Sequence, residues 1–279
     1  MKEIRFESRG LTIAGWSHGE GVPVLAVHGW LDNANTWRPI AERLEGVRWV
    51  SLDMPGHGRS GHVSEGETYH FTDYAPVVLD AADQLGWERF HLVGHSMGGS
   101  VVMLVAAAYP ERVLSVTMVD SFGPVTSPMG VVETLRSALD SRRGRRGKRH
   151  RVVASRELLA ERMRAGNPFL TEPALELLLE RMSEARDGGW AFTYDMGVRD
   201  LSPMRFSEAQ VGDFLEAITS PALLIRAAQG ALLRYGPRDA LLARNPGLRV
   251  VDVEGNHHVH LNEPEVVAPI LGEFLGVSR

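Results

Sequence analysis

Short, continuous apolar runs dominate the first 120 residues, and each run stops at a glycine, serine or aspartate. The four clearest are PVLAVHG (23–29), VRWVSLD (47–53), FHLVGHS (90–96) and VLSVTMVD (113–120). Runs that are apolar at nearly every position are typical of parallel strands buried on both faces. Amphipathic stretches lie between them, and we expect helices at about 34–44, 72–86 and 98–109. The alternation predicts an α/β chain with a mostly parallel central sheet and helices on both faces.

The alternation of strands and helices is interrupted once. Residues 121–210 show no strand periodicity but contain two helical stretches, ASRELLAERMRAG and EPALELLLERMSEA. The pattern then resumes with strands at 221–228 and 248–255 and helices near 237–244 and 264–275. We therefore predict a core domain formed by residues 1–120 and 211–279, with residues 121–210 inserted as a helical cap domain. Residues 3–17 alternate like an antiparallel hairpin at the sheet edge.

Composition excludes several classes of function. The chain of 279 residues is 44% hydrophobic, which is enough for a large core, and its net charge of −5 gives no reason to expect nucleic-acid binding. It has no cysteine, so disulfides, thiolate catalysis and cysteine-based zinc sites are excluded. No apolar stretch resembles a secretory signal or a membrane span, so we expect a cytoplasmic protein. Nothing in the sequence indicates an oligomeric state.

The segment RRGRRGKRHR (142–151) is the most biased part of the sequence, with seven Lys and Arg residues. A run of like charges is usually a solvated loop, and we expect such a loop in the cap. A contact with an anionic surface or partner is the alternative.

The pentapeptide Gly94-His95-Ser96-Met97-Gly98 fits the G-x-S-x-G pattern, directly between an apolar strand and a helix rich in small residues. A turn this sharp strains the serine backbone, and glycine on either side removes steric clashes. Ser96 is therefore the predicted nucleophile. The amide of Met97, at a helix N-terminus, is predicted to donate to an oxyanion.

A second oxyanion donor is expected from the loop His28-Gly29-Trp30, which follows an earlier strand. Gly29 permits a tight turn, and the Trp30 amide is the candidate. For His28 we favour a role in holding this loop by hydrogen bonds over a role as the catalytic base.

The catalytic base should be a histidine on a loop after a late strand, and His257, His258 and His260 all lie there. A metal site formed by these three is the less favoured interpretation, because no carboxylate accompanies them at a recognised zinc spacing.

Four segments together resemble the α/β-hydrolase superfamily: HGW (28–30), DMPGHGRS (53–60), GHSMGG (94–99) and GNHHVHLNEPE (255–265). More narrowly, HGWLDNANTW, VDSFGP, LTEPALELLLERMSEARDGGW and GNHHVHL resemble its serine hydrolase-like (kraken-type) branch. In the superfamily the catalytic histidine lies seven positions before a proline. The resemblance therefore implies His257, which precedes Pro264 by seven residues, as the base.

The acid of the triad departs from the pattern of the superfamily. The usual aspartate follows the seventh strand, where this chain has Gly230 in LLIRAAQGALL. Some branches place the acid after the strand that follows the nucleophile helix, and Asp120 ends that strand here. Asp120 is thus the favoured acid, with Asp239 and Asp252 as alternatives. The predicted order Ser96, Asp120, His257 is the one expected for this fold.

Two further motifs favour structural roles. DMPGHGRS contains residues typical of turns, and we interpret it as a turn after a strand. Trp190, Phe192 and Tyr194 alternate in the predicted cap, and a packed strand or extended segment is favoured over a substrate wall.

These residues predict a serine hydrolase that cleaves small to medium carboxylic esters through an acyl-enzyme, with no cofactor or metal required. The expected partner is a small-molecule ester. Dehalogenases and epoxide hydrolases of this fold place aspartate at the nucleophile position, so Ser96 argues against both. A hydrolase of carbon–carbon bonds in ring-fission products, which shares the S-M-G-G run, is the enzymatic alternative. A ligand receptor that keeps the fold without hydrolysis is the alternative from another class.

Overall fold

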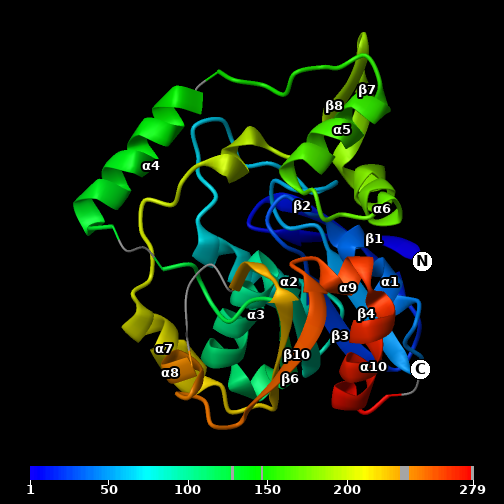
Figure 1. The fold of residues 1–279 in the computed structure, drawn as a ribbon, viewed down its shortest axis with the longest axis vertical. Helices are drawn as coiled ribbons and strands as arrows, with labels where there is room; N and C mark the ends of the chain where they lie inside the picture. The colour runs from blue at the N-terminus through cyan, green and yellow to red at the C-terminus, as the bar shows by residue number, and fades with distance from the viewer. Residues whose placement is uncertain (127–128, 146, 233–238, 278–279) are drawn as a thin grey trace.

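The computed structural model describes residues 1–126, 129–145, 147–232 and 239–277, and an eight-stranded sheet forms its centre (Figure 1). The strand order is β1-β2-β4-β3-β5-β6-β9-β10. The strands are β1 (Lys2–Ser8), β2 (Leu11–His18), β3 (Val22–Val27), β4 (Val47–Leu52), β5 (Phe90–His95), β6 (Val113–Val119), β9 (Ala222–Gln229) and β10 (Leu248–Asn256). At one edge β1 pairs antiparallel with β2, and β2 pairs antiparallel with β4. Every neighbouring pair from β4 to β10 in the strand order is parallel. The predicted sheet and edge hairpin are confirmed.

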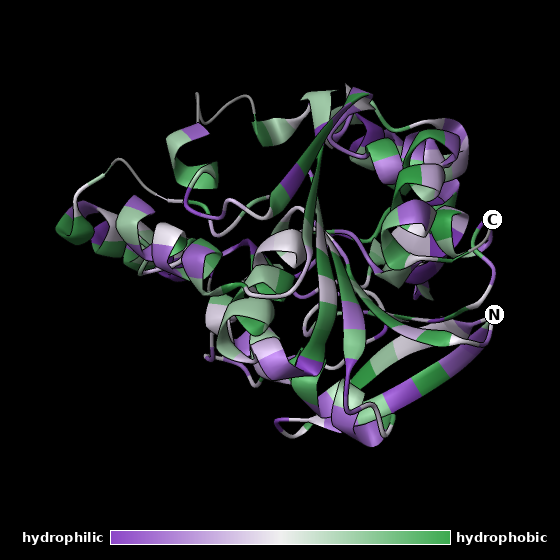
Figure 2. Ribbon diagram, turned by 90° about the horizontal axis from the view of Figure 1, so that it is seen from below, coloured by the Kyte–Doolittle hydropathy of each residue, from purple (hydrophilic) through white to green (hydrophobic). Residues whose placement is uncertain are grey.

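Helices cover both faces of this sheet (Figure 2). One face packs against α2 (Tyr74–Gln84), α3 (Met97–Ala108) and α7 (Glu208–Ala217). The other packs against α1 (Arg38–Ala41) and α10 (Pro264–Leu275). Alternate residues of β3 enter the two separate cores, Leu25 on one side and Val24 on the other. Burial on both faces is the reason that the central strands are apolar throughout.

Shorter helices lie in the connections between strands and after the last strand. They are η1 (Ala34–Trp37), η2 (Phe71–Asp73), η3 (Pro110–Arg112), α8 (Asp239–Leu242) and α9 (Val259–Asn262). The helix expected near 237–244 corresponds to α8, although residues 237 and 238 lie outside the described residues.

The segment between β6 and α7 forms a group of elements at one end of the sheet, at the top of Figure 1. Its elements are α4 (Val131–Arg145), α5 (Arg156–Gly166), α6 (Glu172–Met182), β7 (Ser183–Arg186), β8 (Gly189–Phe192) and η4 (Met196–Arg199). A separate apolar cluster, which includes Leu159, Leu175 and Leu178, holds α5 and α6 together. The division into a core and a cap domain remains a prediction.

The inserted segment contains two strands, β7 and β8, which pair as an antiparallel hairpin. With four residues each, they are too short to show a periodicity in the sequence. The basic run was expected to be a loop, but residues 142–145 form the last turn of α4, where Arg145 pairs with Asp200 at 2.5 Å. Residue 146 lies outside the described residues. Trp190 and Phe192 lie on β8 and Tyr194 follows it, which confirms the packed extended segment.

Asp53, which we interpreted as a turn residue, also ties the inserted segment to the sheet. Its buried carboxylate accepts hydrogen bonds from the amides of Ala34 (2.7 Å) and Arg59 (2.9 Å). It also pairs with Arg181 of α6, whose guanidinium lies 2.7 Å away and is 2% exposed. Within the described part of the chain, no helix has both the length and the apolar character needed to cross a bilayer.

Candidate active site

Ser96 lies at the sharp turn between β5 and α3, with backbone dihedral angles of φ 50° and ψ −114°. A positive φ is costly for any residue with a Cβ atom, so the surrounding backbone must enforce it. Gly94 and Gly98 make this possible. A Cβ at Gly94 would collide with the Gly98 carbonyl, and one at Gly98 would collide with the Val27 carbonyl at the end of β3. Close backbone packing therefore requires glycine at both glycine positions of the predicted G-x-S-x-G turn.

His257 directly follows β10 and contacts both other members of the predicted triad. Its Nε2 lies 2.9 Å from the Ser96 hydroxyl, and its Nδ1 lies 2.5 Å from Oδ2 of Asp120. Because an ionised carboxylate only accepts, Nδ1–H donates to Asp120 and Nε2 is left to accept from Ser96. Three side chains from the ends of β5, β6 and β10 are thus joined in one line of hydrogen bonds.

Asp120 follows β6 with a φ of 46°, and its side chain is fully buried. Besides His257, Oδ2 accepts from the Ala231 amide at 2.7 Å. A Cβ at Gly230 would collide with this carboxylate. The glycine at the position of the superfamily's usual acid is therefore needed to make room for the carboxylate of Asp120.

The two alternative acids lie elsewhere. Asp252 is exposed on β10 and pairs with Arg226 at 2.5 Å, and this guanidinium lowers the pKa of Asp252. Asp239 is exposed and also faces Arg226, at 4.0 Å. Among the described hydrogen bonds of His257, the carboxylate partner is Asp120.

The two predicted oxyanion donors lie on adjoining segments. Met97 is the first residue of α3, and the β3 end that leads to Trp30 packs against that helix N-terminus at Gly98. The Trp30 side chain is 49% exposed, and its indole N–H donates to the Val198 carbonyl at 2.7 Å. The assignment of these two amides to an oxyanion remains a prediction.

The structural role expected for His28 is confirmed. The buried ring donates from Nδ1 to the Gly29 carbonyl at 2.6 Å and accepts the Met54 amide on Nε2 at 2.9 Å. Burial lowers the pKa of His28, which favours this neutral form. His28 thus ties the loop after β3 to the turn after β4.

His258 and His260 hydrogen-bond to residues other than Ser96. Nε2 of His258 lies 3.3 Å from Oδ1 of Asp32, and Nε2 of His260 lies 2.8 Å from the Thr36 hydroxyl. Burial lowers the pKa of His260 well below its usual range.

Two residues next to the triad were missed by the sequence analysis. His95 precedes the predicted nucleophile, and its Nε2 lies 2.7 Å from the backbone carbonyl of His257, the predicted base, so it helps to hold that loop in place. Burial lowers the pKa of His95 to about 4. Asp32 lies beside it. Although burial alone would raise the pKa of Asp32, the neighbouring His258 holds that pKa well below its usual range. His95 occupies the first variable position of the G-x-S-x-G motif, and the motif gives no information on what such a residue contacts.

Comparison with known proteins agrees with this geometry. The alpha/beta hydrolase fold family matches residues 22–264. The serine hydrolase-like protein of Danio rerio is 32% identical over 93% of this chain and 83% of its own length. The serine hydrolase-like protein of Mus musculus is 30% identical over 95% of this chain and 92% of its own length. The crystal structure of the hypothetical protein PA1622 from Pseudomonas aeruginosa PAO1 superposes with a TM-score of 0.92 at 37% identity, over 99% of this chain and 100% of the other.

The fold, the strained serine turn and these relatives lead to one conclusion: the chain belongs to the α/β-hydrolase fold family, in its serine hydrolase-like branch.

Proposed function

We propose that the protein hydrolyses carboxylic esters with small to medium acyl groups, by way of an acyl-enzyme on Ser96. The observation that carries this proposal is the continuous line of hydrogen bonds from the Ser96 hydroxyl through His257 to the buried Asp120. Nucleophile, base and orienting acid within hydrogen-bond reach of one another form the geometry used for acyl transfer.

In the first half-reaction, His257 Nε2 takes the proton of the Ser96 hydroxyl while the serine oxygen attacks the acyl carbonyl carbon. Asp120 stabilises the imidazolium, and the amides of Trp30 and Met97 hold the negative oxygen of the tetrahedral intermediate. The ester C–O bond then breaks, and His257 returns its proton to the departing alcohol.

In the second half-reaction, water replaces the alcohol. His257 takes a proton from the water as its oxygen attacks the acyl-enzyme carbonyl. The bond to Ser96 breaks, the serine oxygen regains a proton from His257, and the carboxylic acid leaves. The two half-reactions together consume one ester and one water and require no cofactor.

The test is a series of 4-nitrophenyl esters with acyl chains from two to ten carbons, assayed with the wild-type protein and with Ser96→Ala. We expect turnover of the shorter esters and loss of about 10³-fold or more in kcat in the variant. Turnover of a ring-fission dienone but of no ester would favour the carbon–carbon bond hydrolase. No turnover of either class by the folded protein would favour the receptor.

A further inference from the structure

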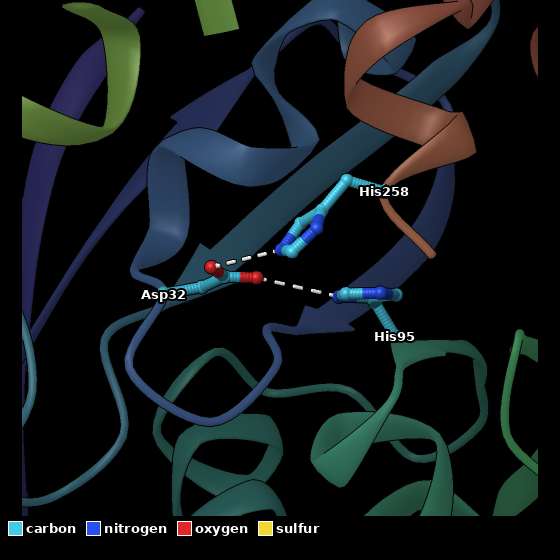
Figure 3. A group of neighbouring side chains, drawn as sticks. All are labelled: Asp32, His95 and His258. Carbon is cyan, nitrogen blue, oxygen red and sulfur yellow. Dashed lines mark hydrogen bonds and ion pairs between the residues drawn. The ribbon is translucent and has the colours of Figure 1, made fainter. Parts of the chain in front are cut away.

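Three buried side chains, Asp32, His95 and His258, face one another beside the triad (Figure 3). They come from the loop after β3, the end of β5 and the segment before α9. One oxygen of Asp32 lies 3.3 Å from Nε2 of His258, and the other lies 3.3 Å from Nδ1 of His95. One ligand atom from each of the three residues can be chosen so that all lie within 4.8 Å of one another.

The hydrogen bonds of this cluster leave lone pairs facing each other. A neutral imidazole carries one N–H, and that of His95 is used at Nε2, which donates to the His257 carbonyl at 2.7 Å. Nδ1 of His95 is then an acceptor, and it faces Oδ2 of Asp32, which is also an acceptor. Neither atom has a hydrogen-bond partner, although both are buried. An imidazole with one N–H can donate to only one of the two oxygens that its nitrogens face, so a second proton on His95 or a cation beside Nδ1 is needed to complete the contact.

No permanently charged cation among the described residues fills this place. The ion pairs of Asp32 involve His95 and His258, and no lysine or arginine of the described residues pairs with it. A carboxylate buried with two imidazoles is instead a typical donor set for a divalent transition metal.

We propose that Asp32, His95 and His258 bind one divalent transition metal ion of the zinc type. Tetrahedral bonds of about 2.0–2.1 Å place neighbouring ligand atoms about 3.3 Å apart. Each imidazole nitrogen already lies at this distance from one of the two carboxylate oxygens, His95 from Oδ2 and His258 from Oδ1. Since one ligand atom of each residue lies within 4.8 Å of the others, the three groups must draw together to bind an ion.

The second hydrogen bond of His95 supports the same assignment. Histidines that ligate metals usually donate their other ring N–H to a carbonyl or carboxylate, which fixes the tautomer and the ring orientation. His95 already makes this bond, and the acceptor is the backbone of the catalytic histidine.

The ion would therefore have a structural role that goes beyond the proposed hydrolysis. It would hold the loop after β3, the nucleophile turn and the His257 loop together without contacting Ser96. The ester reaction proposed above does not use it, so the two proposals can fail independently.

The test is a binding measurement on the whole chain after treatment with a chelator and dialysis. We expect equilibrium dialysis to give about one Zn²⁺ per chain, and Co²⁺ to give visible absorption bands that free Co²⁺ lacks. The melting temperature should rise by about 5 °C when Zn²⁺ is present at about a hundredfold excess over its Kd. No Zn²⁺ or Co²⁺ binding at concentrations up to about 1 mM would overturn the proposal.

Variants locate the ion. His258→Gln and Asp32→Asn should each weaken Zn²⁺ binding by about 100-fold or more, because each removes a ligand. His91→Gln is the control, since His91 contacts the Ser115 hydroxyl away from the cluster, and it should bind as the wild type does. If Asp32→Asn does not fold, His258→Gln and the Co²⁺ spectrum decide.

A His257→Ala variant separates this site from the triad. The proposal predicts that it still binds Zn²⁺ with little change. Binding that is lost in His257→Ala but kept in His258→Gln would place the ion on the catalytic histidine and overturn the proposal.

Discussion

Single residues determine the geometry of the candidate triad through two unusual backbone conformations. Ser96 and Asp120 both have a positive φ although neither is glycine. Such conformations cost about 1–3 kcal/mol each and persist only where the surrounding structure enforces them. Here the Ser96 amide donates to the Val119 carbonyl and the Asp120 amide to the Ile225 carbonyl, so adjacent strands fix both turns.

The Asp120→Asn variant tests the acid. The amide has the same shape but lacks the charge that stabilises the His257 imidazolium. We expect kcat to fall by about 10²- to 10⁴-fold while KM stays nearly unchanged. Asp252→Asn, which removes an exposed carboxylate paired with Arg226, is the matched control and should keep kcat within a few fold. Steady-state ester kinetics on both folded variants measure this, and a nearly wild-type kcat for Asp120→Asn would refute the assignment.

A residue swap tests why the acid has left its usual position. Gly230→Asp alone should reduce activity strongly, because its side chain would collide with the Asp120 carboxylate. Asp120→Gly alone removes the acid. In the double variant Asp120→Gly/Gly230→Asp, the new carboxylate has the vacated space, and kcat should recover by about tenfold or more over Asp120→Gly. Full activity of Gly230→Asp alone would show that the two positions do not compete.

How far the site could be predicted depends on whether its signals are local. The Ser96 turn and the His257 loop carry local motifs, and the structure brings both residues together as the sequence suggested. Asp32 and His95 were missed because their contact joins the loop after β3 to the end of β5, and no spacing along the chain records it. Similarly, His258 acquires its carboxylate from a residue 226 positions away.

Whole elements differ in how clearly the sequence reveals them. The parallel strands were predicted to within one or two residues, because burial on both faces leaves a continuous apolar run. The helix α4 has two buried residues among its fifteen, so its apolar periodicity is weak. The strands β7 and β8 have four residues each, which is too few to show an alternation. The buried ion pair between Arg181 of α6 and Asp53, which follows β4, also has no signal in the sequence.

That ion pair predicts a large effect on stability. Arg181→Met would leave the carboxylate of Asp53 buried without its charged partner, and we expect a loss of about 3–5 kcal/mol in the free energy of unfolding. Urea denaturation measures it. Arg244→Met is the control, because Arg244 pairs with Asp213 and Glu216 at the surface and should change stability little. Equal effects of the two variants would mean that the Arg181 contact does not hold α6 in place.

At the scale of the whole molecule, buried neutral histidines make stability depend on pH. Burial lowers the pKa of His57 to about 3 and that of His91 to about 4. In the unfolded chain both return to about 6.5. Below that pH the unfolded chain binds protons that the folded chain does not, so stability falls as the pH is lowered from about 6.5 towards 4.

His57 is the clearest case, because it is fully buried between His28 and Tyr74. Between pH 7.5 and pH 5.0 its contribution to the loss of stability is about 2 kcal/mol. His57→Phe should remove that part of the pH dependence, as measured by urea denaturation at the two pH values. His70→Phe changes an exposed histidine and should leave the pH dependence as in the wild type. An unchanged pH dependence in His57→Phe would mean that His57 is protonated in the folded protein.

The central claim is that Ser96 is a nucleophile activated by His257. The test is reaction with a fluorophosphonate, which reacts preferentially with activated serines, followed by intact mass measurement and peptide mapping. We expect one adduct per chain, on Ser96, with no adduct in Ser96→Ala and labelling at least about 10³-fold slower in His257→Ala. An adduct that persists in folded Ser96→Ala, or wild-type labelling rates in His257→Ala, would contradict it.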